Sequence, residues 1–198
     1  MLAAFRLTLG ALTVVAVVRQ LAVHMAYGLD VVNFFSFFTN LSNLLAAATF
    51  IWSGMHARRG RSEPLALERL RLVSVTNMTL VGIVFAALLR NTDLGVLLPW
   101  VNVVVHDVMP VAVVLDWLLA PPPRRLGSGD WWWCWPMPLV YLIYTMTRGA
   151  LVGWYPYPFL RPELTGGYPG VAVYVVGIMA LFLATGALAV FSANRRTA

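Results

Sequence analysis

The chain has 198 residues, of which 60% are hydrophobic and only 11% are charged. An ordinary soluble domain carries roughly 25% charged residues, so this composition excludes a water-soluble globule. The 14 basic side chains, all of them arginine, outweigh eight acidic ones and give a net charge of +6. No polar domain is present that could carry an element that contacts a nucleic-acid groove, so no nucleic-acid partner is expected. The positive charge instead indicates which side of a membrane each connection lies on.

Six apolar segments follow one another with short polar breaks, and each approaches the ~20 residues that a helix needs to cross a bilayer. In chain order they lie near residues 5–26, 34–55, 72–90, 100–119, 132–153 and 170–191. We therefore expect one all-α integral membrane domain over residues 1–198, built as a six-transmembrane-helix bundle.

The arginines are distributed asymmetrically among the breaks between these segments. One side of a six-helix arrangement receives Arg6, Arg58, Arg59, Arg61, Arg69, Arg71, Arg124, Arg125, Arg195 and Arg196. The other side contains Arg161, with Arg90 at its border. Since flanking Lys and Arg residues stay in the cytoplasm, both termini are predicted to be cytoplasmic.

Polar side chains occur inside the apolar segments, where lipid makes them costly unless they face protein or water. Counted from the expected outer ends, they fall at a similar depth in four helices. They are Arg19 in the first segment, Thr39, Asn40 and Asn43 in the second, Asn102, His106 and Asp107 in the fourth, and Tyr144 and Arg148 in the fifth. We therefore expect a polar chamber in the outer half of the bundle.

Helical spacing places several of these side chains on common faces. Ser36, Thr39, Asn40 and Asn43 form one stripe, which could equally serve only to bond neighbouring helices. Asp107 is expected to act as a counter-ion for Arg148 or Arg19. Other polar and aromatic residues near segment ends, Asp116 with Trp117 and the tryptophans at 131–135, are expected to anchor the helices at the interface.

His106 stands out because a neutral imidazole can accept a proton near pH 7. The stretch F-F-T-N-L-S-N that contains Thr39, paired with N-V-V-V-H-D-V-M-P around His106, resembles the androgen-induced and androgen-dependent-regulator membrane proteins of animals. The chain looks closer still to their bacterial relatives, the Pr6Pr membrane family. The Y-P-F-L at 157–160 is similar to the segment that follows the fifth helix in that family.

This resemblance implies a six-helix threonine hydrolase of fatty acid esters of hydroxy fatty acids. It implies Thr39 as the nucleophile and His106 as the base, with Asn102 one turn before the histidine. Asp107 and the T-N-L-S-N continuation depart from the animal pattern, which leaves the substrate open.

The chemistry of the residues is compatible with this role. A threonine hydroxyl needs a base to become a nucleophile, and the oxyanion that forms needs hydrogen-bond donors. Asn40, Asn43 or Asn102 could supply such donors, and Arg148 or Arg19 could hold a fatty-acid carboxylate. We expect a lipid or fatty-acid ester as substrate and no cofactor.

Other functions fit the same residues. A small transporter or lipid-binding protein could use the chamber without chemistry, with Arg19 and Arg148 receiving an anion and His106 relaying protons. A haem site would use His24 and His106 as axial ligands, and a metal hydrolase would lack ligands beyond His106 and Asp107. The lysine-free, Ala-, Val- and Arg-rich composition favours a bacterial cytoplasmic (inner) membrane.

Overall fold

The computed structural model describes residues 1–93 and 95–195, and over these residues it contains helices and no strand. The long helices are α1 (Leu2–Ala26), α3 (Phe38–Arg58), α4 (Leu65–Val84), α8 (Pro136–Val152) and α10 (Tyr168–Asn194). A further continuous rod joins α5 (Pro99–Val103), the π-helical η2 (Val104–Val108) and α6 (Met109–Leu119). The expected all-α class is thus confirmed.

Shorter elements connect these rods. They are α2 (Val31–Phe35), the π-helical η1 (Phe85–Leu89) that continues α4, α7 (Ser128–Trp131), the 3-10 helices η3 (Trp132–Cys134) and η4 (Pro158–Leu160), and α9 (Pro162–Thr165). The apolar centre of the bundle lies around α4, whose Leu72 and Met78 have no exposed surface and which packs between α3, α6 and α10.

Four helices in the described part of the chain are long and apolar enough to cross a membrane: Leu2–Ala26, Leu65–Leu89, Pro99–Leu119 and Tyr168–Asn194. This agrees with an integral membrane protein. The other two expected spans correspond to α3 and α8. These two helices differ from the other four. Helix α3 is less apolar, since it buries polar side chains such as Asn43 and Ser53, and α8 is shorter, since its 17 residues extend over ~26 Å at 1.5 Å per residue.

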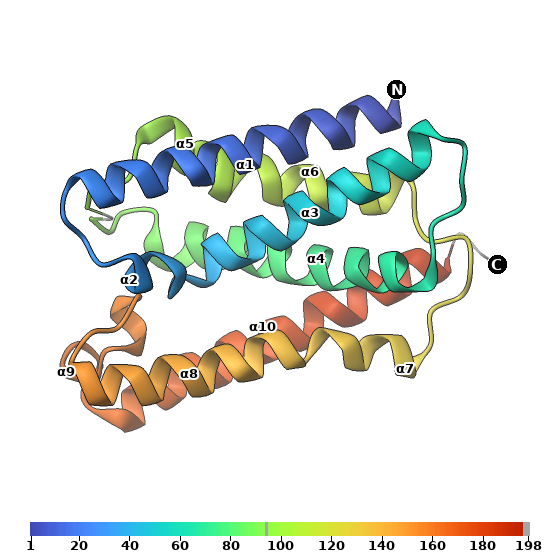
Figure 1. The fold of residues 1–198 in the computed structure, drawn as a ribbon. Helices are drawn as coiled ribbons and strands as arrows, with labels where there is room; N and C mark the ends of the chain where they lie inside the picture. Colours follow the sequence, from blue (N-terminus) through green and yellow to red (C-terminus); the bar gives the residue numbers. More distant parts are fainter. Residues whose placement is uncertain (94, 196–198) are drawn as a thin grey trace.

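The bundle has two distinct ends (Figure 1). One, which we call the terminal end, carries the start of α1, the α3–α4 and α6–α7 connections and the end of α10. The opposite end, here the α2 end, carries α2, α9 and the connection between η1 and α5. The arginine-rich connections therefore share the terminal end, except that Arg196 lies outside the described residues.

Helix α1 lies against α3 through small residues on both helices. A Cβ atom added at Gly10 would come within 2.8 Å of Ile51 Cγ1, and one at Gly54 within 2.8 Å of Leu7 Cγ. Small residues allow helix backbones to approach closely in membrane proteins. The pairing holds the polar face of α3 toward the remainder of the bundle.

Two predicted segment starts are corrected by the structure. The segment expected to begin near residue 34 is divided into α2 and α3, because the chain breaks at Ser36 and Phe37 and restarts at Phe38. Thr39 therefore lies in the first turn of a helix and not several residues inside one. The segment expected from residue 72 begins at Leu65, since the charges of its first turns are paired.

One of these paired charges, Arg71, belongs to a largely buried group of four residues that we call the terminal-end ion cluster. Arg6 contacts Asp116 at 2.6 Å and Glu63 at 3.0 Å, while Arg71 contacts Asp116 at 2.9 Å and Glu63 at 2.8 Å. Asp116 is 3% exposed, so its predicted role as an interfacial anchor is wrong. Its carboxylate instead bridges the arginines of α1 and α4.

Candidate functional site

A cavity of about 380 Å³ opens at the α2 end of the bundle, and we call it the large cavity. Residues of α1, α2, α3 and η2 line it, together with the η1–α5 and α8–α10 connections. Its polar lining includes Gln20, His24, Thr39, Asn40, His106 and Arg161. The large cavity therefore contains a hydroxyl, an imidazole and a guanidinium from different parts of the chain.

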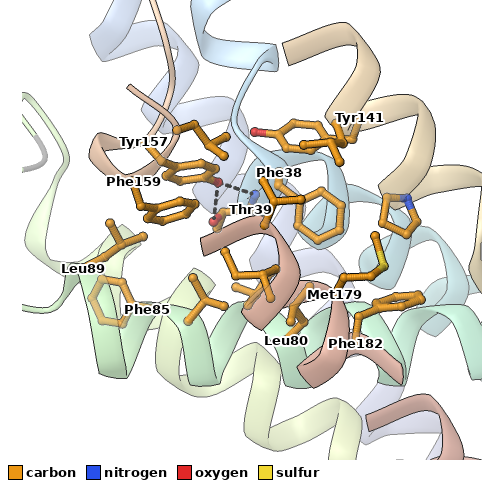
Figure 2. A pocket seen from close by; sticks show the side chains of 17 residues that line it. Phe38, Thr39, Leu80, Phe85, Leu89, Tyr141, Tyr157, Phe159, Met179 and Phe182 are labelled. Atoms are coloured by element: carbon orange, nitrogen blue, oxygen red, sulfur yellow. Dashed lines mark hydrogen bonds between the residues drawn. The ribbon is translucent and has the colours of Figure 1, made fainter. Parts of the chain in front are cut away.

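Thr39 is held by a tyrosine from the α8–α10 connection. Its backbone N–H, one of the first-turn donors that have no partner inside a helix, donates to Tyr157 Oη at 3.2 Å. Thr39 Oγ1 lies 3.4 Å from the same phenol oxygen. Figure 2 shows both interactions converging on Tyr157.

The Tyr157 phenol stays protonated at this position. Burial raises the pKa of Tyr157 above its ordinary value, because the charged phenolate is disfavoured away from water. The ring is stacked on Phe159 at 5.1 Å between centroids. Tyr157 can therefore accept the Thr39 N–H and still donate its own proton toward Thr39 Oγ1 or an oxygen atom bound beside it.

Asn43 connects the threonine to the histidine-bearing helix. Its Nδ2 donates to Thr39 O, one turn earlier in α3, at 2.9 Å and to Val105 O in η2 at 3.0 Å. Asn43 has no exposed surface. The amide thus fixes the level at which α3 and η2 meet, directly beside Thr39 and His106.

His106 lies in a π-helical turn that the sequence explains. Pro110 has no N–H to donate to the carbonyl of His106, which disfavours a regular α-helical turn there, and the Met109 N–H reaches back five residues to Val104 O. The ring of His106 stacks on Phe85 of η1, with centroids 4.0 Å apart and planes at 13°. Two π-helical turns from neighbouring rods thus face each other.

The hydrogen bond of His106 defines which nitrogen is available. Nδ1–H donates to Asn102 Oδ1 at 2.6 Å, which leaves Nε2 as the acceptor of the neutral ring. Asn102 therefore orients the histidine, one helical turn away from it. This is the arrangement that a general base requires.

The structure brings Thr39 and Asn40 of α3 and His106 of η2 to the wall of one cavity, although they come from two separate rods. The hydrogen bonds of the threonine and the histidine lead to Tyr157 and to Asn102 respectively. Asn40 Nδ2 donates to Phe34 O at 2.8 Å and so fastens α2 to α3. Thr39 and His106 therefore share a space without a direct bond in this state.

Four other predicted site residues lie elsewhere. Arg148 donates to Asn33 Oδ1 at 2.7 Å, approaches Asp30 at 3.7 Å and lies over the Trp154 ring. Asp107 pairs with Arg90 at 3.0 Å, so its expected pairing with Arg148 or Arg19 is wrong.

Tyr144 and Arg19 are both exposed residues. The hydroxyl of Tyr144 shares a hydrogen bond with Ser36 Oγ at 2.8 Å. Arg19 is not among the residues that line the large cavity, whereas its neighbour Gln20 is.

Sequence reasoning missed three contributors to this end of the bundle. Gln20 accepts from Leu98 N at 3.0 Å and donates to Val96 O at 3.1 Å, which ties α1 to the connection before α5. Arg161 and Tyr157 enter the cavity wall from the α8–α10 connection. Tyr157 had a signal in the Y-P-F-L stretch, but its partner Thr39 is 118 residues away in the sequence.

His24 also lines the large cavity, and one of its ring nitrogens, Nε2, is hydrogen-bonded to Asp30 O at 2.8 Å. The described residues include no group of three or more His, Cys, Asp or Glu side chains that could hold a metal ion. Comparison with known proteins finds no family model, no curated protein and no solved structure that matches the chain.

Proposed function

We propose that the chain is an intramembrane lipid-ester hydrolase with Thr39 as nucleophile and His106 as general base. The observation that carries this proposal is the large cavity, whose wall includes both side chains. The Asn102 bond that leaves His106 Nε2 free to accept a proton supports the assignment further. The resemblance to six-helix threonine hydrolases of fatty acid esters of hydroxy fatty acids points to the same pair.

The reaction proceeds in two balanced steps. His106 Nε2 takes the proton of Thr39 Oγ1 as this oxygen bonds to the ester carbonyl carbon. The bond to the alcohol oxygen then breaks, and the alcohol leaves with that proton. In the second step a water molecule gives its proton to His106 and attacks the acyl-threonine, after which Thr39 recovers the proton and the fatty acid departs. Both steps require an approach of ~3 Å between base and hydroxyl in the substrate complex.

Tyr157 is the proposed oxyanion donor, because its hydroxyl can still donate its proton, whereas the backbone N–H of Thr39 already donates to the Tyr157 oxygen. Asn43 Nδ2 already donates to two carbonyls, and Asn102 is engaged with the histidine, so these amides serve the site by holding it. The Tyr157 hydroxyl lies 3.4 Å from Thr39 Oγ1. When Oγ1 bonds to a carbonyl carbon, the oxygen of that carbonyl would come within reach of the Tyr157 O–H. A substrate carboxylate would meet Arg161, which lines the cavity, in preference to Arg148.

We further propose six membrane spans, with α3 and α8 as the additional two, and cytoplasmic termini in a bacterial inner membrane. Support comes from the shared terminal end of the arginine-rich connections (Figure 1). Reporter domains fused to each terminus should be active only when the reporter functions in the cytoplasm. A terminus that reports from the outside contradicts this orientation.

The catalytic assignment is tested with purified protein and a fluorophosphonate probe, which labels activated hydroxyls. Thr39→Ala should abolish labelling and lower turnover of a branched fatty-acid ester by about a thousandfold or more, and His106→Gln should lower turnover by about a hundredfold or more. Thr79→Ala is the matched control, because Thr79 Oγ1 donates to Val75 O one turn earlier in its own helix and Thr79 is not among the residues that line the large cavity. Labelling and turnover that survive in Thr39→Ala overturn the assignment.

The same experiment separates hydrolysis from transport. A transporter or lipid-binding protein that uses the large cavity would bind or move the ester and leave it intact, with no covalent label at Thr39. Hydrolysis that disappears with Thr39 excludes that alternative as the main activity.

A further inference from the structure

Thr39 also lines a second cavity, which has a volume of about 90 Å³ (Figure 2). We call it the apolar cavity, because hydrocarbon side chains form nearly all of its wall. Typical members are Leu80 and Phe85 from the α4–η1 rod, Leu142 from α8, and Val175 and Phe182 from α10. It lies among four rods and, unlike the large cavity, has no charged residue in its lining.

Thr39, Tyr157 and Leu89 line both cavities. The threonine hydroxyl therefore lies at the boundary between an apolar space and a polar one. Besides Thr39 and Tyr157, Tyr141 also brings a hydroxyl to the apolar cavity. This hydroxyl already donates to Ser36 O at 3.0 Å. Within the apolar cavity, the Thr39 and Tyr157 pair is thus the polar feature that a ligand would meet.

The size of the apolar cavity limits what it can hold. An apolar cavity of ~150 Å³ accommodates a benzene molecule, so about 90 Å³ accommodates only a few methylene groups. A longer chain would have to continue out of the cavity. The two helices that supply its outer wall, α8 and α10, carry exposed apolar side chains on their outer faces, among them Val140, Ile143, Val173 and Val176. A chain passing between α8 and α10 would enter lipid.

We infer that the apolar cavity binds the first methylenes of the acyl chain of the ester, next to the carbonyl carbon, while the large cavity takes the alcohol half. This inference rests on the proposed function of Thr39. The acyl chain is the occupant that fits, because it is purely apolar, reaches the site from the bilayer and carries its single polar group at the end that meets Thr39. The remainder of the chain runs between α8 and α10.

The inference is tested with esters that share one alcohol and differ in acyl length, from acetate through hexanoate to palmitate. Val175→Phe narrows the apolar cavity from α10 and should lower the ratio of hexanoate to acetate turnover by about tenfold. Val176→Phe is the matched control, because Val176 is the next residue, is 68% exposed and does not line the cavity. Its ratio should equal that of the wild-type chain.

Met179→Ala widens the same cavity and provides a second test of the inference if the Val175→Phe variant does not fold. It should raise the ratio for branched or longer chains, since it provides room in the wall. Acyl-length profiles that are unchanged in both Val175→Phe and Met179→Ala, with the variants eluting as folded protein, overturn the inference.

A binding measurement distinguishes failure of this inference from failure of the proposed function. A palmitic acid probe with a photoreactive diazirine near its carboxyl group should crosslink to residues of the apolar cavity, and crosslinking should fall in Val175→Phe and persist in Val176→Phe. A wild-type chain that hydrolyses no ester yet gives this crosslinking pattern refutes the hydrolase and retains the acyl site. A hydrolase whose crosslinks lie only on outer helix faces refutes the acyl site.

Discussion

Thr39 Oγ1 has a phenol as its hydrogen-bonding neighbour, and the histidine expected to activate it is bonded to an asparagine. Both arrangements have a physical reason. The first N–H groups of α3 need an acceptor from outside the helix, which Tyr157 supplies, and the neutral histidine needs an acceptor for its single N–H. The two bonds fix each side chain without consuming the lone pair on His106 Nε2.

Tyr157→Phe tests the phenol. The variant removes one donor beside Thr39 Oγ1 and leaves the ring in place, so turnover should fall by about a hundredfold while the KM stays close to that of the wild-type chain. Tyr27→Phe is the control, because Tyr27 is 67% exposed in the connection after α1. Equal turnover in Tyr157→Phe and the wild-type chain would show that the phenol only packs against Phe159 and Thr39.

Between elements, the contact that decides the site geometry is the one between α3 and η2. Asn43 donates to a carbonyl on each of them, and the stacking of His106 on Phe85 connects η2 to η1 in the same layer. The π-helical turns matter here, because a regular α-helix through Pro110 would present a different face of the rod at position 106. Hydrogen bonds between membrane helices are individually modest, so packing and bonding act together.

Asn43→Ala should therefore lower the free energy of unfolding by on the order of 1–2 kcal/mol, since it leaves two buried carbonyls without this donor. The measurement is the midpoint of thermal unfolding in detergent, followed by ester turnover. Ser42→Ala is a closely matched control, because Ser42 is also fully buried in α3 but its Oγ has no hydrogen-bond partner among the described residues. A smaller loss of stability in Asn43→Ala than in Ser42→Ala contradicts this role for Asn43.

At the scale of the whole molecule, the two ends of the bundle differ in what they bury. The terminal-end ion cluster joins α1, α4, α6 and the α3–α4 connection through paired charges. Nearby, Arg124 contacts Asp130 at 2.8 Å and Glu68 at 2.6 Å, and the hydrogen bond from Arg124 holds the pKa of Asp130 well below its usual range. The α2 end instead leaves its polar groups around an open cavity. The ion pairs at the terminal end hold the helices together, whereas the cavity at the α2 end leaves space for a ligand.

Asp116→Asn tests how much the terminal-end ion cluster contributes to stability. Breaking a buried network by removing one charge leaves two arginines under-compensated, and such changes cost ~3–5 kcal/mol. We expect a large drop in the midpoint of thermal unfolding, with little change in the KM of protein that remains folded. Glu163→Gln is the control, because its pair with Arg161 is exposed and such pairs contribute ~1 kcal/mol or less. Equal midpoints for the two variants would mean that the cluster contributes little to stability.

The sequence by itself determined the helical class, the approximate positions of the apolar rods and the concentration of arginines in alternate connections. These features depend on composition and on local periodicity, which each segment carries on its own. It also singled out Thr39, Asn102 and His106, because polar groups in apolar segments are conspicuous. The helix starts at Phe38 and Leu65 were missed, since an early break and a set of paired charges depend on neighbours outside the segment.

Only the tertiary structure decided which polar groups meet. Gln20 lines the cavity and Arg19 does not, because one residue along a helix turns the side chain by about 100°. Asp107 forms an ion pair with Arg90, and Asp116 forms ion pairs with Arg6 and Arg71. Thr39 forms a hydrogen bond with Tyr157, 118 residues away in the chain. Such pairings are set by the packing of whole rods against one another, and no local pattern in the chain encodes the angle and level at which two rods come into contact.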